Sequence, residues 1–150
     1  MLPDSARQIT AIINRYCELF DTGQLDAFAA QFEHGQWHRA EAGAKATRQW
    51  IDEHVLLYDG LPATKHLTTN LVVEVDEEAG TATARSYITV LQALPDFPLQ
   101  PIFAGRYRDR FTRVGDQWHW IRREVIADLY GDVSHHVQSP ARPAPTFQGR

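Results

Sequence analysis

The order of its periodicities constrains the fold of this chain more than any other feature. Apolar residues recur at helical spacing in its N-terminal part, over residues 4–20, 24–31 and 44–57. Long runs rich in β-branched and aromatic residues, typical of strands, follow at 64–75, 81–93, 102–113 and 117–128. Helices followed by a block of strands predict an α+β domain whose helices gather on one side of an antiparallel sheet.

The predicted strands are long for a chain of 150 residues, so the sheet must bend strongly. A curved sheet closed by N-terminal helices would form a cone, whose interior is a natural place for a ligand. A short additional strand is expected around Trp37, within residues 32–39. Alternation along 64–75 predicts four residues on one face: His66, Thr68, Asn70 and Val72. Alternation along 102–113 predicts three aromatic residues on one face, opposite a row of arginines: Phe103, Tyr107 and Phe111.

Composition narrows the classes of function. A hydrophobic fraction of 43% with 23% charged residues is typical of one soluble domain with a real core. The net charge of −4, without a basic run, gives no reason to expect nucleic acid. The apolar runs are shorter than the roughly 20 residues of a membrane helix, and no signal peptide is recognisable. The single cysteine, Cys17, reads as a buried thiol and favours a cytoplasmic location.

The chain loses its periodicity at Gly131. We therefore expect a single domain over residues 1–132 and an extended C-terminal tail over 133–150, which is rich in proline. The pair His135–His136 lies in that tail. Adjacent side chains point in different directions and no cysteine or carboxylate cluster accompanies them, so a contact of a tail or lid is favoured over a metal site.

Three segments carry a resemblance to a known family. They are the helix end Tyr16-Cys17-Glu18-Leu19-Phe20-Asp21, the strand start Lys65-His66-Leu67-Thr68-Thr69-Asn70, and the hairpin from Gly105-Arg106-Tyr107 to Trp118-His119-Trp120. Over residues 5–132 the chain resembles the SnoaL-like branch of the nuclear transport factor 2-like superfamily. Within that superfamily it resembles scytalone dehydratase, bile acid 7α-dehydratase and hexachlorocyclohexane dehydrochlorinase. The resemblance implies a cystatin-like α+β barrel: a cone-shaped, curved antiparallel sheet closed by N-terminal helices.

The resemblance also implies a catalytic pair, Asp21 and His66, because those relatives use an Asp at the end of the first helix and a His at a strand start. A carboxylate bonded to one imidazole nitrogen fixes the tautomer and leaves the other nitrogen free as a general base. Several relatives also use a polar residue one helical turn before the Asp, and Tyr16 occupies that position here. Some use an arginine of the last strand, for which Arg122 is the preferred match and Arg123 the alternative. A core tyrosine, a capping aspartate and a surface histidine or arginine remain as alternatives for these positions.

The function that follows is a cofactor-independent lyase, a dehydratase acting on a small, largely apolar, hydroxylated cyclic or polyketide-like substrate. The same base could serve an isomerase or cyclase, and the same cone could be a non-catalytic ligand-binding protein or resemble a dioxygenase small subunit. No metal or organic cofactor is needed for this chemistry. A homodimer or homotrimer is expected. The predicted substrate-binding residues are one amide and four aromatic side chains: Asn70, Phe28, Trp50, Tyr107 and Trp120.

Overall fold

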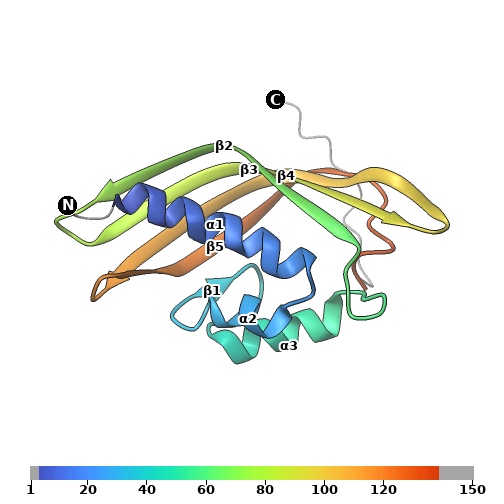
Figure 1. Ribbon diagram of the computed structural model, residues 1–150, viewed down its shortest axis with the longest axis horizontal. Helices are drawn as coiled ribbons and strands as arrows, with labels where there is room; N and C mark the ends of the chain where they lie inside the picture. Colours follow the sequence, from blue (N-terminus) through green and yellow to red (C-terminus); the bar gives the residue numbers. More distant parts are fainter. Residues whose placement is uncertain (1–3, 139–150) are drawn as a thin grey trace.

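The computed structural model describes residues 4–138, which form three helices and one five-stranded sheet (Figure 1). The elements are α1 (Ser5–Asp21), α2 (Leu25–Ala30), β1 (Gln36–Trp37), α3 (Ala44–His54), β2 (Thr64–Asp76), β3 (Thr81–Leu94), β4 (Phe97–Val114) and β5 (Gln117–Tyr130). The predicted α+β class and the order of helices before strands are confirmed. Within residues 4–138, no helix combines the length and apolar character needed to cross a membrane.

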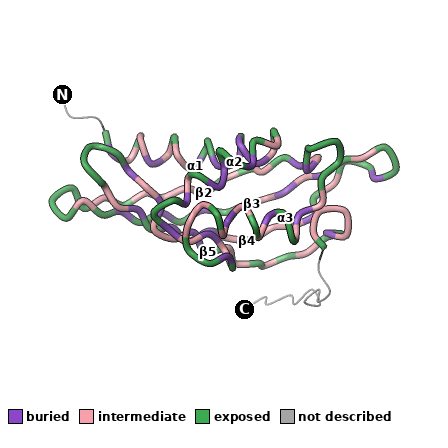
Figure 2. The backbone as a smooth tube through the Cα atoms, turned by 90° about the horizontal axis from the view of Figure 1, so that it is seen from below, coloured by how far each residue is buried: buried purple, intermediate pink, exposed green. Residues whose placement is uncertain are grey.

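The sheet has the strand order β1-β5-β4-β3-β2. Its four long strands are antiparallel to their neighbours, and only the two-residue β1 runs parallel to its partner β5. Helix α1 crosses the long strands, and the view turned by 90° shows α1 and α2 on one side of the sheet (Figures 1 and 2). We call the side that faces α1 the inner face and the opposite side the outer face.

The ends of α1 are both set by local chemistry. The carboxylate of Asp4 caps the N-terminus by accepting hydrogen bonds from the backbone of Ala6 and Arg7. At the C-terminus the Gly23 N–H donates to Phe20 and the Gln24 N–H to Leu19, which is a Schellman motif. Gly23 has a φ of 73°, and a Cβ there would lie 2.4 Å from the carbonyl oxygen of Gly60. Glycine is therefore required at this turn, which fixes Asp21 as the last residue of α1.

The two central strands, β3 and β4, show the cleanest alternation between faces. Inner residues of β3 such as Ala84 and Ile88 are buried. Tyr107 pairs with Ser86 and Phe111 with Ala82, so the predicted inner face of β4 is confirmed. The outer face carries charge, because Arg108 pairs with Arg85 and Glu124, and Arg110 with Thr83 and Arg122. A groove of about 510 Å³ runs over it, lined largely by charged residues, among them Arg85, Arg108, Arg110, Arg122, Glu74 and Glu124.

The predicted alternation along β2 is wrong beyond Thr69. A β-bulge interrupts the pairing with β3 between Thr69 and Val72, and Asn70 there has a φ of 55°. The extra residue exchanges the faces of everything that follows. His66 and Thr68 therefore share the inner face with Val73, whereas Val72 lies on the outer face opposite Arg85.

Other boundaries differ from the sequence prediction by a few residues. Helix α3 ends at His54, where Val55 leaves the helix to form an isolated bridge with Val137. Strand β4 begins at Phe97, five residues before the predicted start, because Pro98 and Pro101 are accommodated beside a register shift with β3. The predicted short strand is reduced to Gln36–Trp37.

The segment after β5 does not extend away from the domain as predicted. Residues 132–138, which we call the strap, fold back across the end of α3. The strap is held by backbone hydrogen bonds from Leu56 to His136 and from Gln138 to His54, and Val133 is buried. The remaining part of the predicted tail, 139–150, lies outside the described residues.

Candidate functional site

The Asp21 carboxylate lies at the junction of α1 and β2 and accepts three hydrogen bonds there. The Nδ1 atom of His66 lies 2.6 Å from Oδ1, the hydroxyl of Thr64 donates to Oδ1 at 2.8 Å, and the backbone N–H of His66 donates to Oδ2 at 2.8 Å. The side chains of His66 and Asp21 are only 8% and 6% exposed. The contact that the family resemblance implied between these two residues is therefore present, and both side chains are nearly buried.

The protonation state of this pair follows from its contacts. Burial alone would raise the pKa of Asp21, but the hydrogen bonds from His66 and Thr64 outweigh it and lower that pKa. The carboxylate is therefore ionised at neutral pH and can only accept hydrogen bonds. The proton on the neutral imidazole then resides on Nδ1, and Nε2 is left as an available base. No described residue hydrogen-bonds that nitrogen.

The surroundings of the pair are largely apolar. The ring of Phe20, the residue before Asp21, lies edge-on to the His66 ring with centroids 5.0 Å apart. The thiol of Cys17, one turn earlier on α1, lies 3.5 Å from the Thr68 hydroxyl, and its pKa is raised by burial. From the strap, the ring of His136 lies 6.3 Å from that of His66. The imidazole is therefore enclosed by α1, β2 and the strap.

A second buried pair lies deeper on the inner face, between Asp109 of β4 and Arg123 of β5. Two parallel hydrogen bonds of 2.8 and 2.9 Å join the guanidinium to the carboxylate, and both side chains are 0% exposed. The guanidinium lies 3.6 Å from the ring centroid of Tyr107, 4.3 Å from that of Tyr16 and 4.5 Å from that of Trp120. Burial raises the pKa of Asp109, and the guanidinium opposes that shift.

Sequence reasoning missed Asp109, although a signal was there. Asp109 lies two residues after Tyr107 and two before Phe111, so alternation alone puts its carboxylate on the buried face of β4. A buried carboxylate requires a cationic partner. Arg123 is that partner, because it pairs with Asp109 across the strands while its neighbour Arg122 faces the other way.

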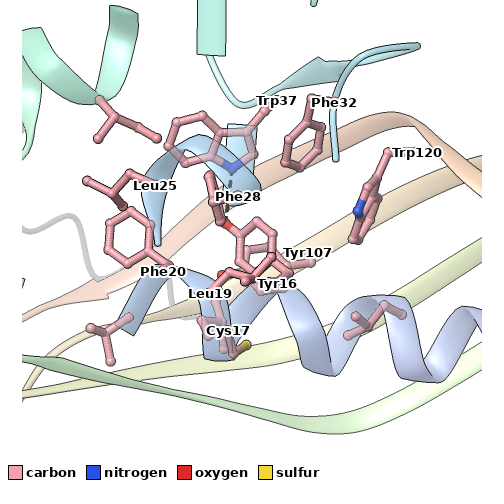
Figure 3. Close-up of a cluster of buried hydrophobic side chains, with 14 of the residues drawn as sticks. Tyr16, Cys17, Leu19, Phe20, Leu25, Phe28, Phe32, Trp37, Tyr107 and Trp120 are labelled. Atoms are coloured by element: carbon pink, nitrogen blue, oxygen red, sulfur yellow. Dashed lines mark hydrogen bonds between the residues drawn. The ribbon is translucent and has the colours of Figure 1, made fainter. Parts of the chain in front are cut away.

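The predicted assisting residue Tyr16 belongs to this deeper cluster. Its hydroxyl accepts a hydrogen bond of 3.0 Å from the indole N–H of Trp37, drawn as a dashed line in Figure 3. Burial raises the pKa of Tyr16, although Arg123 and hydrogen bonds from Tyr107 and Trp37 oppose that rise. The geometry fits the alternative of a core tyrosine with a satisfied hydroxyl.

Arg122 and Asn70 are not brought to the Asp21–His66 pair. The Arg122 guanidinium donates to the carbonyls of His38 at 2.7 Å, Arg123 at 3.0 Å and Gln36 at 3.5 Å, and so ties the edge strand β1 to β5. Asn70 is exposed at the β-bulge, where its positive φ turns the strand. Both residues therefore have evident structural roles.

The four aromatic residues predicted to bind substrate pack mainly against one another and their neighbours. Phe28, Tyr107 and Trp120 are 0%, 3% and 1% exposed, and each makes a ring contact with Tyr16. Figure 3 shows these rings gathered around that tyrosine. Trp50 stacks on the ring of His54 with centroids 4.3 Å apart. The interior of the cone is thus filled, and a ligand must displace side chains or the strap to reach His66.

Two residues beside the pair, Thr64 and His136, were not predicted as site residues. The hydroxyl of Thr64 donates a hydrogen bond to the Asp21 carboxylate. The one sequence signal for this role was the position of Thr64 at the predicted start of the strand that carries His66. His136 and His135 do point to different surroundings, since the ring of His135 packs on Phe97 and that of His136 on Phe20. Within residues 4–138, no three His, Cys, Asp or Glu side chains are arranged to hold a metal ion.

Comparison with known proteins identifies the family. The model of the SnoaL-like domain matches residues 4–124. No curated protein matches the chain. Among solved structures, Rv3472(D26N), a protein of unknown function from Mycobacterium tuberculosis, is 28% identical with a TM-score of 0.69, over 83% of this chain and 76% of its own.

Two structures from Novosphingobium aromaticivorans support the fold. One, an NTF2-like protein with a cystatin-like fold, is 24% identical with a TM-score of 0.65, over 80% of this chain and 79% of its own. The other, described as a "putative scytalone dehydratase", is 21% identical with a TM-score of 0.67, over 97% of this chain and 93% of its own. The fold is therefore NTF2-like and cystatin-like, as the sequence predicted, and the chain belongs to the SnoaL-like domain family.

Proposed function

We propose that the protein is a cofactor-independent lyase, a dehydratase in which Asp21 and His66 transfer a proton on a small, hydroxylated cyclic ketone. The observation that carries this proposal is the 2.6 Å contact of His66 Nδ1 with an ionised, nearly buried carboxylate, which leaves Nε2 as a base. The SnoaL-like family includes dehydratases, isomerases and cyclases, which is consistent with such a base.

The proposed reaction needs only these two side chains for its proton transfers. His66 Nε2 takes a proton from the carbon beside the substrate carbonyl, and Asp21 stabilises the imidazolium that forms. The C–O bond of a hydroxyl on the next carbon then breaks as the C=C bond forms. The imidazolium returns its proton to the departing hydroxyl, which leaves as water, and the enzyme is restored. A substrate without that hydroxyl would undergo proton exchange or a double-bond shift at the same base.

Two model compounds allow proton abstraction by the base and elimination of water to be measured separately. Exchange of the α-protons of 1-tetralone in D₂O, followed by NMR, reports proton abstraction alone. Loss of water from 3-hydroxy-1-tetralone, which yields 1-naphthol, reports the complete dehydration by its absorbance. We expect the protein to accelerate both reactions above their uncatalysed rates, and His66→Ala to lower both by about 10²–10⁴-fold.

The control for this experiment is His119→Ala, because His119 is a partly exposed histidine of β5 whose ring contacts only His34 among the described rings. Exchange without dehydration would favour an isomerase or cyclase. Unchanged rates in the His66→Ala protein would contradict the assignment of the base, and a protein that binds these ketones without exchanging their protons would be a binding protein.

We also propose that the protein forms a homo-oligomer through the outer face of the sheet. Three large apolar side chains of this face, from β2, β3 and β5, are strongly exposed: Leu67 at 42%, Tyr87 at 54% and Leu129 at 51%. Light scattering should give a mass of two or three chains. Tyr87→Glu should shift it towards one chain, and a wild-type mass of one chain would contradict the proposal.

A further inference from the structure

The strap brings a second histidine beside His66. The ring centroids of His136 and His66 are 6.3 Å apart, and His136 also lies edge-on to Phe20 at 6.0 Å. Two hydrogen bonds of about 2.8 Å that meet at one hydroxyl oxygen at a tetrahedral angle hold their two nitrogens about 4.5 Å apart. Ring nitrogens lie about 1 Å from the ring centroid, so nitrogens that face each other on these two rings come within reach of one shared ligand oxygen.

The polar capacity of His136 is unused. Its Nδ1 atom is buried and has no hydrogen-bond partner, although buried polar atoms are almost always paired. Burial lowers the pKa of His136 to about 3, so the ring is neutral near neutral pH. A neutral imidazole offers one donor and one acceptor, which is the complement of a hydroxyl group.

The backbone of the strap holds this ring in place. The carbonyl of His136 accepts from Leu56 N–H at 2.9 Å, and its own N–H donates to Val133 at 3.0 Å. The carbonyl of the preceding His135 accepts from the Tyr58 hydroxyl at 2.6 Å and from the Gln92 amide at 3.1 Å. Gln92 pairs with Thr64 across the sheet, so the strap is fastened directly beside the residues that hold Asp21.

We propose that His136 is the substrate-binding residue that recognises the hydroxyl group of the substrate, and that the strap carries it into the site once the substrate is seated. This inference rests on the proposed function for its choice of substrate. The His136 ring binds the oxygen that departs, while His66 removes the neighbouring proton and returns it to that oxygen. As a consequence, the protein should bind a hydroxylated ketone in preference to the same ketone without a hydroxyl.

The test is His136→Phe, which keeps an apolar ring against Phe20 and removes both nitrogens. We expect dehydration of 3-hydroxy-1-tetralone to fall tenfold or more, whereas α-proton exchange of 1-tetralone stays within about twofold, because 1-tetralone has no hydroxyl to bind. His135→Phe is the matched control in the same strap, since its ring packs on Phe97 outside the site and its carbonyl is unaltered. It should change neither rate.

The outcomes separate this inference from the proposed function. Equal losses of exchange and dehydration in His136→Phe, or no loss of dehydration, would overturn the role of His136 while leaving His66 as the base. If the wild-type protein catalyses neither reaction, the proposed function fails, and binding then decides the inference. In the His66→Ala background, 3-hydroxy-1-tetralone should bind several-fold more tightly than 1-tetralone, and adding His136→Phe should abolish that difference. Equal affinities of the His66→Ala protein for the two ketones, or no binding of either ketone, would overturn the role of His136.

Discussion

The two buried pairs on the inner face each contain an aspartate and a nitrogen base, but they differ in burial and in surroundings. Asp109–Arg123 is completely buried, doubly hydrogen-bonded and surrounded by three aromatic rings. Asp21–His66 is slightly exposed, and it lies at the meeting point of a helix end, a strand start and the strap. Only the second pair contains an imidazole, which can act as a proton acceptor, whereas an arginine stays charged.

Under the proposed function, burial and pairing do not by themselves mark the catalytic site. A pair that is fully enclosed and holds a fixed charge stabilises one arrangement of the core. In our proposal, the other pair acts as a base through its free nitrogen, and the neighbouring strap, which is held by a few hydrogen bonds, gives way to admit the substrate. Making the same Asp→Asn substitution in each pair separately tests this distinction most directly.

The largest effect is expected from Asp21→Asn. The amide cannot stabilise an imidazolium and would let the wrong tautomer of His66 form, so proton exchange on 1-tetralone should fall by about 10²–10⁴-fold. The stability of the protein should change less, because the amide oxygen can still accept the bond from the His66 backbone N–H, while the amide NH₂ group can donate to the Thr64 hydroxyl and to His66 Nδ1. Exchange rates and urea unfolding of the same preparation measure both. A loss of stability large enough to explain the lost activity would contradict the comparison.

The same substitution at the other pair, Asp109→Asn, should have the opposite profile. It leaves the Arg123 charge buried without compensation, which costs about 3–5 kcal/mol in the free energy of unfolding. Urea unfolding measures this loss. Exchange activity of the molecules that remain folded should be nearly unchanged. As a control, the double variant Asp109→Leu with Arg123→Met removes both charges and should recover most of the lost stability. A double variant no more stable than Asp109→Asn would show that the pair is not the cause.

The difference between the two pairs also explains what the sequence could reveal. The order of helices and strands and the inner face of β4 are local patterns, and they were predicted. The bulge at Asn70 was not, because an inserted residue leaves the β-branched and aromatic composition of a strand unchanged while exchanging its faces. The position of Arg123 rather than Arg122 on the inner face depends on a similar register shift between β4 and β5, after Arg110.

Long-range contacts account for the rest of the site. Asp21 and His66 are 45 residues apart, and only the family resemblance suggested that they meet. His136 and Phe20, whose rings are in contact, lie near opposite ends of the domain sequence. Nothing in the residues around Gly131 indicated that the chain turns back. Whether a pocket is open or filled depends on how the aromatic side chains pack, which no local pattern encodes.

The strap is expected to respond to acid. Burial lowers the pKa of His136 to about 3 and that of His38 to about 4, whereas an unfolded histidine titrates near 6.5. Below pH 6.5 the unfolded chain therefore binds more protons than the folded one, so stability falls as the pH falls, by at most about 1.4 kcal/mol per pH unit for each histidine. Between pH 6.5 and 5, above the titration of the carboxylates, the slope should be shallower in His136→Phe.

Urea unfolding at several pH values measures that slope, and the matched control is again His135→Phe. His135→Phe should keep the wild-type slope, because no buried, unpaired nitrogen is removed. An unchanged slope in His136→Phe would show that His136 is protonated in the folded protein, and it would place the strap away from the apolar surroundings of Phe20.

The smallest effect is expected from Thr64→Val, which removes one of the three hydrogen bonds to Asp21 and keeps the shape of the side chain. The loss of one such bond costs about 1 kcal/mol in the free energy of unfolding. Because the Thr64 hydroxyl helps to lower the pKa of Asp21, that pKa should rise towards its ordinary value, and an NMR titration of the carboxyl carbon would show the shift. Asp21 would still be ionised at neutral pH, so exchange activity should fall only severalfold.

Thr83→Val, on the exposed outer face of β3, is the control and should alter neither the titration nor the exchange rate. A titration of Asp21 unchanged by Thr64→Val would mean that His66 alone holds the carboxylate, and would reduce the site to its two proton-transferring side chains.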